Sequence, residues 1–203
     1  MLYNLFPTLV HKSAYTGDLT SLQASIIPEL NDIFEDAQSN NQVSMRNGGI
    51  CSVNTCNKLQ DKFDLTELIE FVTGSVNEYW KALGYVDANV RVFHAWANKY
   101  PPGSYIDNHN HSPSPLTASF YLKKPAESGN IVFENPISTL LRYQPYKGLG
   151  DSENYASAFD ETVEVNEGEL VIFPGWLMHK TEINNSTEDR IIIGFDIAYE
   201  KNT

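Results

Sequence analysis

The sequence predicts a mainly β protein in which short strands form a sandwich or barrel and helices from the first part of the chain pack outside it. Apolar residues recur at helical spacing in residues 1–89, and short runs rich in β-branched and aromatic residues follow from about Val90. Gly, Pro and Asn clusters separate those runs, where turns are expected. Because no repeat or low-complexity tract divides the chain, we expect one domain over residues 1–203, with its β core at 90–203.

Two helices are expected in the first part of the chain. From Leu19 to Phe34 apolar side chains recur at helical spacing, and Pro28 is expected to split or kink this segment because it lacks a backbone donor. The second apolar stripe, from Leu65 to Leu83, is unbroken. Asp64 can cap its first turn, and Gly84 suits the left-handed position just after a helix.

Six short strands are expected after residue 90, as in a sandwich or barrel. They are Val92 to Ala97, Tyr105 to Asn110, Leu116 to Leu122, Ile131 to Phe133, Leu170 to Phe173 and Ile191 to Ile197. The segment from Ser138 to Asp160 interrupts this rhythm and is rich in Tyr, Gly, Ser and Asn. An insertion of that length is often a functional lid, so we expect substrate selectivity in its stretch from Arg142 to Tyr155.

Composition narrows the classes of partner. The chain has 26 acidic and 14 basic residues and a formal net charge of -12, which opposes binding to nucleic acid or to anionic membranes. No apolar run approaches the roughly 20 residues that cross a bilayer, and the first ten residues do not resemble a secretion signal, so we expect an intracellular, cytoplasmic protein. Cys51 and Cys56 are expected to be reduced thiols, because a lone pair of cysteines is a weak zinc signal.

Three of the five histidines lie in two short segments, at His109, His111 and His179. In a strand, residues i and i+2 point to the same face, so the first two would project together. His179 follows a strand end and a turn that could bring it opposite that pair. Three neutral imidazoles suit iron, zinc, copper or nickel and leave positions open on the ion. The alternative is a pair of exposed loop histidines with His179 elsewhere.

The stretch from Tyr100 to Leu122 resembles the iron(II)- and 2-oxoglutarate-dependent oxygenases related to the prolyl hydroxylases. In that family two aromatics around a Gly-containing turn precede a His-x-carboxylate pair, and a later Thr or Ser lies four residues before a Tyr-Leu. The corresponding residues here are Tyr100, Gly103, Tyr105, His109, His111, Thr117, Tyr121 and Leu122. A distal His followed about ten residues later by an Arg is matched by His179 and Arg190. The whole chain is similar to a bacterial and phage branch that carries a His-x-His pair.

The resemblance implies a double-stranded β-helix, a jelly-roll or cupin-like barrel. It also implies iron(II) and 2-oxoglutarate as cofactors, O₂ as cosubstrate, and hydroxylation of a peptide side chain, protein side chain or small metabolite. Arg190 would hold the far carboxylate of 2-oxoglutarate, since a guanidinium presents a planar fork of donors. Thr117 and Tyr100 would add hydroxyl hydrogen bonds. The alternative for Arg190 is a rim ion pair with Glu188 or Asp189.

One position departs from the family pattern. Residue 111 is His, where the family has Asp or Glu, so the metal ligands would be His109, His111 and His179. Asp107 shares the predicted strand face and could supply a carboxylate instead, and Glu134 is a remoter candidate. A site of three histidines lacks one negative charge, which should alter the redox potential and metal preference.

Two other classes of protein fit parts of the pattern. The spacing from Gly103 to His109 and His111, with a second match from Gly168 to Pro174, resembles a cupin, although the acid expected after the His pair is missing. A cupin-like protein could be an isomerase, or a dioxygenase that needs no 2-oxoglutarate. The third class is a non-enzymatic jelly-roll binding module with incidental histidines. His94 has no visible partner and is expected to face the core.

Overall fold

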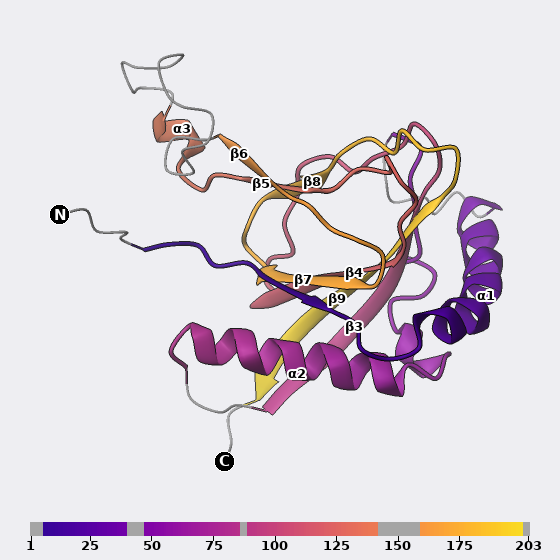
Figure 1. Ribbon diagram of the computed structural model, residues 1–203, viewed down its shortest axis with the longest axis horizontal. Coiled ribbons are helices and arrows are strands. Elements are labelled where there is room, and N and C mark those ends of the chain that lie inside the picture. The colour runs from indigo at the N-terminus through magenta and orange to yellow at the C-terminus, as the bar shows by residue number, and fades with distance from the viewer. Residues whose placement is uncertain (1–5, 40–46, 86–88, 142–158, 201–203) are drawn as a thin grey trace.

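The computed structural model describes residues 6–39, 47–85, 89–141 and 159–200. Within these ranges the chain forms two antiparallel sheets with helices outside them (Figure 1). The larger sheet has the order β1-β7-β4-β9-β3-β2 and the smaller one β6-β5-β8. The helices are α1 Leu19–Ser39, the 3-10 turn η1 Leu59–Asp61, α2 Thr66–Ala82 and α3 Ser138–Leu141. The strands are β1 His11–Ala14, β2 Ile50–Cys51, β3 Asn89–Tyr100, β4 Leu116–Lys123, β5 Ile131–Glu134, β6 Asp160–Val163, β7 Glu169–Pro174, β8 His179–Thr181 and β9 Arg190–Glu200.

Both predicted helices form. Helix α2 agrees with its prediction to within one residue at each end, Gly84 has a φ of 82°, and Asp64 accepts a hydrogen bond from Thr66 N. The predicted split at Pro28 is wrong, because α1 continues through it to Ser39. Pro28 lies on the exposed side of the helix, where water can satisfy the carbonyl that loses its donor. Four buried side chains fix the opposite side, and they are Ile26, Leu30, Phe34 and Ala37.

Five of the six predicted strands form as β3, β4, β5, β7 and β9, and each is longer than predicted. The predicted strand from Tyr105 to Asn110 is wrong, since this segment makes isolated bridges only, from Tyr105 to Gly48 and from His109 to His179. The extended stretch expected at His179 is confirmed as β8. Strands β1, β2 and β6 were not predicted, because they are two to four residues long and carry no apolar alternation.

The alternation of side chains along the larger sheet separates two cores. The outer core lies between this sheet and helices α1 and α2, which cover one of its faces in Figure 1. The inner core lies between the two sheets and includes Trp96, Tyr100, Tyr121, Phe133 and Phe173. This double-layered, mainly β architecture is the predicted double-stranded β-helix.

Three expectations from the sequence concern the rest of the molecule. Cys51 and Cys56 are buried thiols with no disulfide between them, as predicted. No helix in the described ranges is long and apolar enough to span a bilayer. Of the segment from Ser138 to Asp160, the structure describes α3 and residues 159–160, whereas the stretch from Arg142 to Tyr155, where selectivity is expected, lies outside the described residues.

Candidate metal centre

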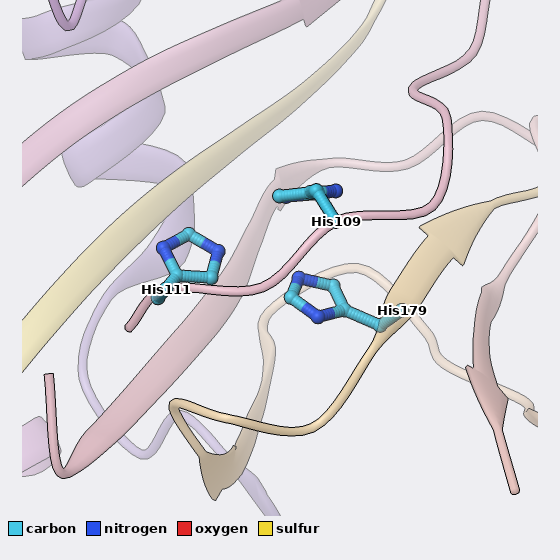
Figure 2. Close-up of side chains that lie close together, drawn as sticks. All are labelled: His109, His111 and His179. Atoms are coloured by element: carbon cyan, nitrogen blue, oxygen red, sulfur yellow. The ribbon is translucent and has the colours of Figure 1, made fainter. Parts of the chain in front are cut away.

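Three histidines converge between the two sheets. His109, His111 and His179 each offer one ring nitrogen, and these atoms all lie within 4.8 Å of one another. The ring centroids are 4.3 Å apart for His109 and His179, 5.2 Å for His109 and His111, and 5.1 Å for His111 and His179. Figure 2 shows the first two on the segment that leads to β4 and the third at the start of β8. The alternative of scattered loop histidines is therefore wrong.

Backbone hydrogen bonds hold the two segments together without a regular strand. His109 N donates to His179 O and His179 N donates to His109 O, both at 2.9 Å. His111 N donates to Gly175 O at 2.7 Å. A Cβ on Gly175 would lie 1.9 Å from Ser114 O, so only glycine allows this approach.

Two of the imidazoles have their Nδ1 atoms engaged by carbonyl groups. His109 Nδ1 lies 2.8 Å from Asp107 O, and His179 Nδ1 lies 2.9 Å from Leu177 O. A carbonyl only accepts hydrogen bonds, so each Nδ1 carries the proton and Nε2 keeps its lone pair. Metal-binding histidines in proteins usually have this arrangement, in which an oxygen fixes the ring and its tautomer.

His111 is held differently, between an aromatic ring and a carboxylate. Its ring stacks on Trp96, with centroids 5.4 Å apart and planes at 28°, and its Nδ1 lies 3.4 Å from Asp196 Oδ1. Trp96 occupies space that a side chain at Gly194 would fill, since a Cβ there would lie 2.5 Å from the indole. The other oxygen of Asp196 lies 3.5 Å from His94 Nδ1. The prediction that His94 faces the core is wrong, because 36% of its side chain is exposed.

Burial keeps the imidazoles of His109 and His179 neutral. It lowers the pKa of His179 well below its ordinary value, and a charge on His109 would lower it further. Burial also lowers the pKa of His109, although the hydrogen bond to Asp107 O opposes this. Both rings are therefore neutral at neutral pH, which is the form that binds a metal ion.

The two candidate carboxylate ligands lie elsewhere. Asp107 is exposed, and its Oδ2 accepts a hydrogen bond from Asn47 at 3.0 Å. Glu134 accepts hydrogen bonds from Asn108 and, at 2.6 Å, from Ser138. Neither belongs to the group of converging ligand atoms. Within the described part of the chain, the geometry therefore favours the set of three histidines over both alternatives.

The histidines form part of the wall of a cavity of about 220 Å³. The cavity follows the inner face of the β3–β9 pair, where Trp96 lies opposite Gly194. Its lining residues are Cys51, Val53, Trp96, Asn98, Tyr100, Ile106, His109, His111, Ser119, Tyr121, Ile131, His179, Thr181, Ile192, Gly194 and Asp196. Several of its polar atoms are buried without a hydrogen-bond partner among the described residues, namely Tyr121 Oη, Asn98 Oδ1 and Asp196 Oδ1. Such orphaned atoms indicate a site built for a polar ligand.

Arg190 lies directly behind this wall and is fully buried. Its guanidinium stacks on the ring of Tyr100, 4.4 Å from the centroid, and Nη2 donates to Thr181 Oγ1 at 3.0 Å. Nη1 donates to the carbonyls of Ser128 and Glu182. Nε has no acceptor in the part of the chain that the structure describes. The alternative of a rim ion pair is wrong, because Arg190 is not at the rim.

Two threonines near the site have different hydrogen bonds. Thr117, a predicted cosubstrate ligand, donates from Oγ1 to Phe195 O at 2.8 Å, and Thr117 does not line the cavity. Thr181 lines the cavity, and its Oγ1 accepts from Ile106 N and from Arg190, so its own hydrogen is left to donate. Tyr121 adds a hydroxyl without a partner among the described residues.

Burial in the same region raises the pKa values of Tyr100 and Tyr121 far above the ordinary value for a phenol, although the charge of Arg190 opposes the shift in both. Both phenols are therefore protonated at neutral pH. The hydroxyl of Tyr121 can donate a hydrogen bond into the cavity.

The fold and the site together define a barrel with a cluster of three converging histidines and a buried arginine nearby. The model of the 2OG-Fe(II) oxygenase family matches residues 94–196, just over half of the chain, and the chain belongs to that family. The matched region holds the three histidines and Arg190. The predicted resemblance and fold are therefore confirmed. A comparison with curated proteins finds no match.

Solved structures support the fold. The epimerase SnoN, in complex with Fe³⁺, alpha ketoglutarate and nogalamycin RO, matches with a TM-score of 0.57 and 13% identity over 94% of this chain and 78% of its own. HygX from Streptomyces hygroscopicus, with nickel and 2-oxoglutarate bound, matches with a TM-score of 0.53 and 12% identity over 94% of this chain and 83% of its own. The viral collagen prolyl hydroxylase vCPH from Paramecium Bursaria Chlorella virus-1 matches with a TM-score of 0.50 and 14% identity over 93% of this chain and 94% of its own. The chain spans about half, 51%, of an oxidoreductase of the 2OG-Fe(II) oxygenase family from Burkholderia pseudomallei.

The cofactors of the family are iron(II) and 2-oxoglutarate, as predicted. The residues fit both. Three converging imidazoles suit iron(II), and Tyr121 Oη and Arg190 Nε, which have no hydrogen-bond partner among the described residues, suit a carboxylate.

Proposed function

We propose that residues 1–203 form one catalytic domain, an iron(II)- and 2-oxoglutarate-dependent dioxygenase that hydroxylates a C–H bond of a peptide side chain, a protein side chain or a small metabolite. The proposed metal ligands are the Nε2 atoms of His109, His111 and His179. The observation that carries the proposal is their convergence on a cavity whose lining residues Thr181 and Tyr100 contact a buried arginine behind them. Three ligands on one side of an ion leave positions open for 2-oxoglutarate and O₂.

Arg190, Thr181 and Tyr121 would hold the far carboxylate of 2-oxoglutarate. Among the described residues, Nε of Arg190 and the hydroxyl of Tyr121 have no hydrogen-bond partner, and the hydroxyl of Thr181 accepts two hydrogen bonds and keeps its own hydrogen to donate. Tyr100 acts through Arg190, since its ring fixes the plane of the guanidinium. Thr117 has no part in this arrangement, because its hydroxyl already donates to Phe195 O.

Bound iron(II), together with 2-oxoglutarate and O₂, supplies the oxidising power for C–H hydroxylation, with succinate and carbon dioxide as coproducts. The chain contributes position and exclusion of water. Ile131, Ile192 and Trp96 give the cavity apolar walls between its polar groups, so bulk water is kept from the reacting atoms.

The proposal is tested by following carbon-labelled 2-oxoglutarate under air with the iron-loaded protein. We expect slow conversion to succinate even without the primary substrate, faster conversion when a substrate is found, and none in the His179→Ala variant. Consumption of O₂ with no loss of 2-oxoglutarate would contradict the proposal and favour the cupin-like chemistry. Peptide and amino-acid libraries then serve to identify the substrate, with succinate as the common readout.

A further inference from the structure

A carboxylate, that of Asp196, lies directly behind His111, one of the three proposed metal ligands. Asp196 is on β9 and lines the same cavity as the three histidines. Its Oδ1 lies 3.4 Å from Nδ1 of His111, and both side chains are 16% exposed. Asp196 is not in the group of converging ligand atoms, so it faces the back of the imidazole rather than the ion position.

The two oxygens of Asp196 have different surroundings. Oδ2 lies 3.5 Å from Nδ1 of His94, whose side chain is partly exposed. Oδ1 is buried and has no hydrogen-bond partner among the described residues, and it is the oxygen that faces His111. A divalent cation held by His111 would place a positive charge on the far side of the imidazole from this oxygen.

Charge counting shows what Asp196 can do. Two histidines and one carboxylate reduce the charge of a divalent ion by one unit, whereas three neutral histidines leave it unchanged. A carboxylate behind His111 restores that one negative charge to the metal site as a whole. It also polarises the Nδ1–H bond of His111, so that Nε2 becomes a stronger donor to the metal. At 3.4 Å the contact is longer than a well-formed N–H···O hydrogen bond, so its effect is mainly electrostatic.

We propose that Asp196 is a positioning residue that supplies, through His111, the negative charge missing from the ligand set. Trp96 completes the arrangement, since its ring stacks on His111 and holds it toward Asp196. The register of β3 and β9 brings these residues together. Trp96 lies opposite Gly194, and Asp196 is two residues further along the same inner face of β9. This inference rests on the proposed metal site.

The test compares Asp196→Asn with the parent protein. Asparagine keeps the shape and an acceptor oxygen and removes only the charge. We expect cobalt(II) affinity, measured anaerobically by competition with a chromophoric chelator, to fall about 10- to 100-fold. We also expect the Fe(III)/Fe(II) potential of the iron-loaded variant to become more positive, because the lost negative charge stabilised the ferric form. Asp196→Ser is a second neutral variant for which the same losses are expected.

The matched control is Glu188→Gln, which removes an exposed carboxylate from the segment that leads into β9. It should leave affinity and potential close to the parent values. The metal-free Asp196→Asn protein should melt close to the temperature of the parent, since the amide keeps the shape of the side chain. Unchanged cobalt affinity in both neutral variants, or weaker affinity with an unchanged potential, would overturn the inference. Failure of the parent protein itself to bind cobalt or iron would overturn the proposed function instead.

Discussion

The two faces of the larger sheet are made by the same strands but differ in the side chains that they carry. On β9, Ile191, Ile193 and Phe195 point to the outer core and are almost completely buried among apolar side chains. The residues that alternate with them, Ile192, Gly194 and Asp196, line the cavity. The outer face therefore contributes apolar burial, whereas the inner face combines apolar burial with polar atoms that have no hydrogen-bond partner among the described residues. We therefore expect that substitutions on the outer face can change stability without changing binding.

The largest expected effect is on the inner face, from His179→Ala. Because His179 is one of three proposed ligands, we expect one-to-one cobalt(II) binding to be lost, a larger effect than the roughly 10- to 100-fold loss typical of groups behind a ligand. The fold should persist, since the outer core is untouched. Titration with cobalt and circular dichroism check the two statements. His11→Ala, on edge strand β1, is the control and should bind metal like the parent. Persistent stoichiometric binding in the His179 variant would refute the ligand set.

The second-largest expected effect comes from a cavity in the outer core. Leu68 of α2 is completely buried in the outer core, so Leu68→Ala should lower the free energy of unfolding by about 2–5 kcal/mol. Metal affinity of the protein that remains folded should not change. Urea denaturation and cobalt titration below the transition measure both quantities. A change in affinity as large as that in stability would mean that the two faces are coupled.

Two glycines, one beside the histidines and one on a helix, give a further test that stability and metal binding can be changed separately. Gly175→Ala would place a Cβ 1.9 Å from Ser114 O, so the segment that carries His111 must move, and we expect roughly tenfold weaker metal binding. A Cβ added to Gly74 of α2 would have open space around it. Gly74→Ala should therefore stabilise the helix by up to about 1 kcal/mol and leave binding unchanged. Equal metal affinities in the two variants would contradict the role assigned to the approach at Gly175.

The smallest expected effect concerns a single hydroxyl. Tyr121→Phe removes a buried donor that has no partner among the described residues, so the metal-free protein should be as stable as the parent or more so. Affinity for 2-oxoglutarate should fall by about 1–1.5 kcal/mol, or roughly tenfold, with metal affinity unchanged. Calorimetric titration of 2-oxoglutarate into the cobalt-loaded protein measures this loss. Parent-like affinity would remove Tyr121 from the carboxylate site.

The sequence was sufficient to predict the fold class and the group of histidines. The ligands lie in two short segments, and an extended backbone brings His109 and His111 to one side even though the predicted strand there is wrong. The β-rich composition of that segment does not ensure pairing, because a strand needs a neighbour with free backbone groups. Here one bridge to His179 and one turn at Gly175 are sufficient.

The hydroxyl and carboxylate groups around the site were harder to predict because their partners come from distant parts of the chain. Thr117 was assigned to the cosubstrate, but the carbonyl of Phe195 on the neighbouring strand already accepts from it. Thr181, which we propose as a donor to the carboxylate, was not predicted, although it lies two residues after His179 and so shares its face. Asp196, for which we propose a positioning role, was not predicted either, although an acidic residue between Phe195 and Ile197 of β9 was a usable signal. Buried polar residues in such strands indicate a site.

The most direct test of the account is an anaerobic titration of 2-oxoglutarate into the iron(II)-loaded protein, followed by the visible charge-transfer absorption of a chelated keto acid. We predict an absorption that saturates with one equivalent of 2-oxoglutarate. This absorption should be absent in His179→Ala, and in Tyr121→Phe it should saturate at a higher concentration of 2-oxoglutarate. Iron bound in full with no such absorption at saturating 2-oxoglutarate would contradict it.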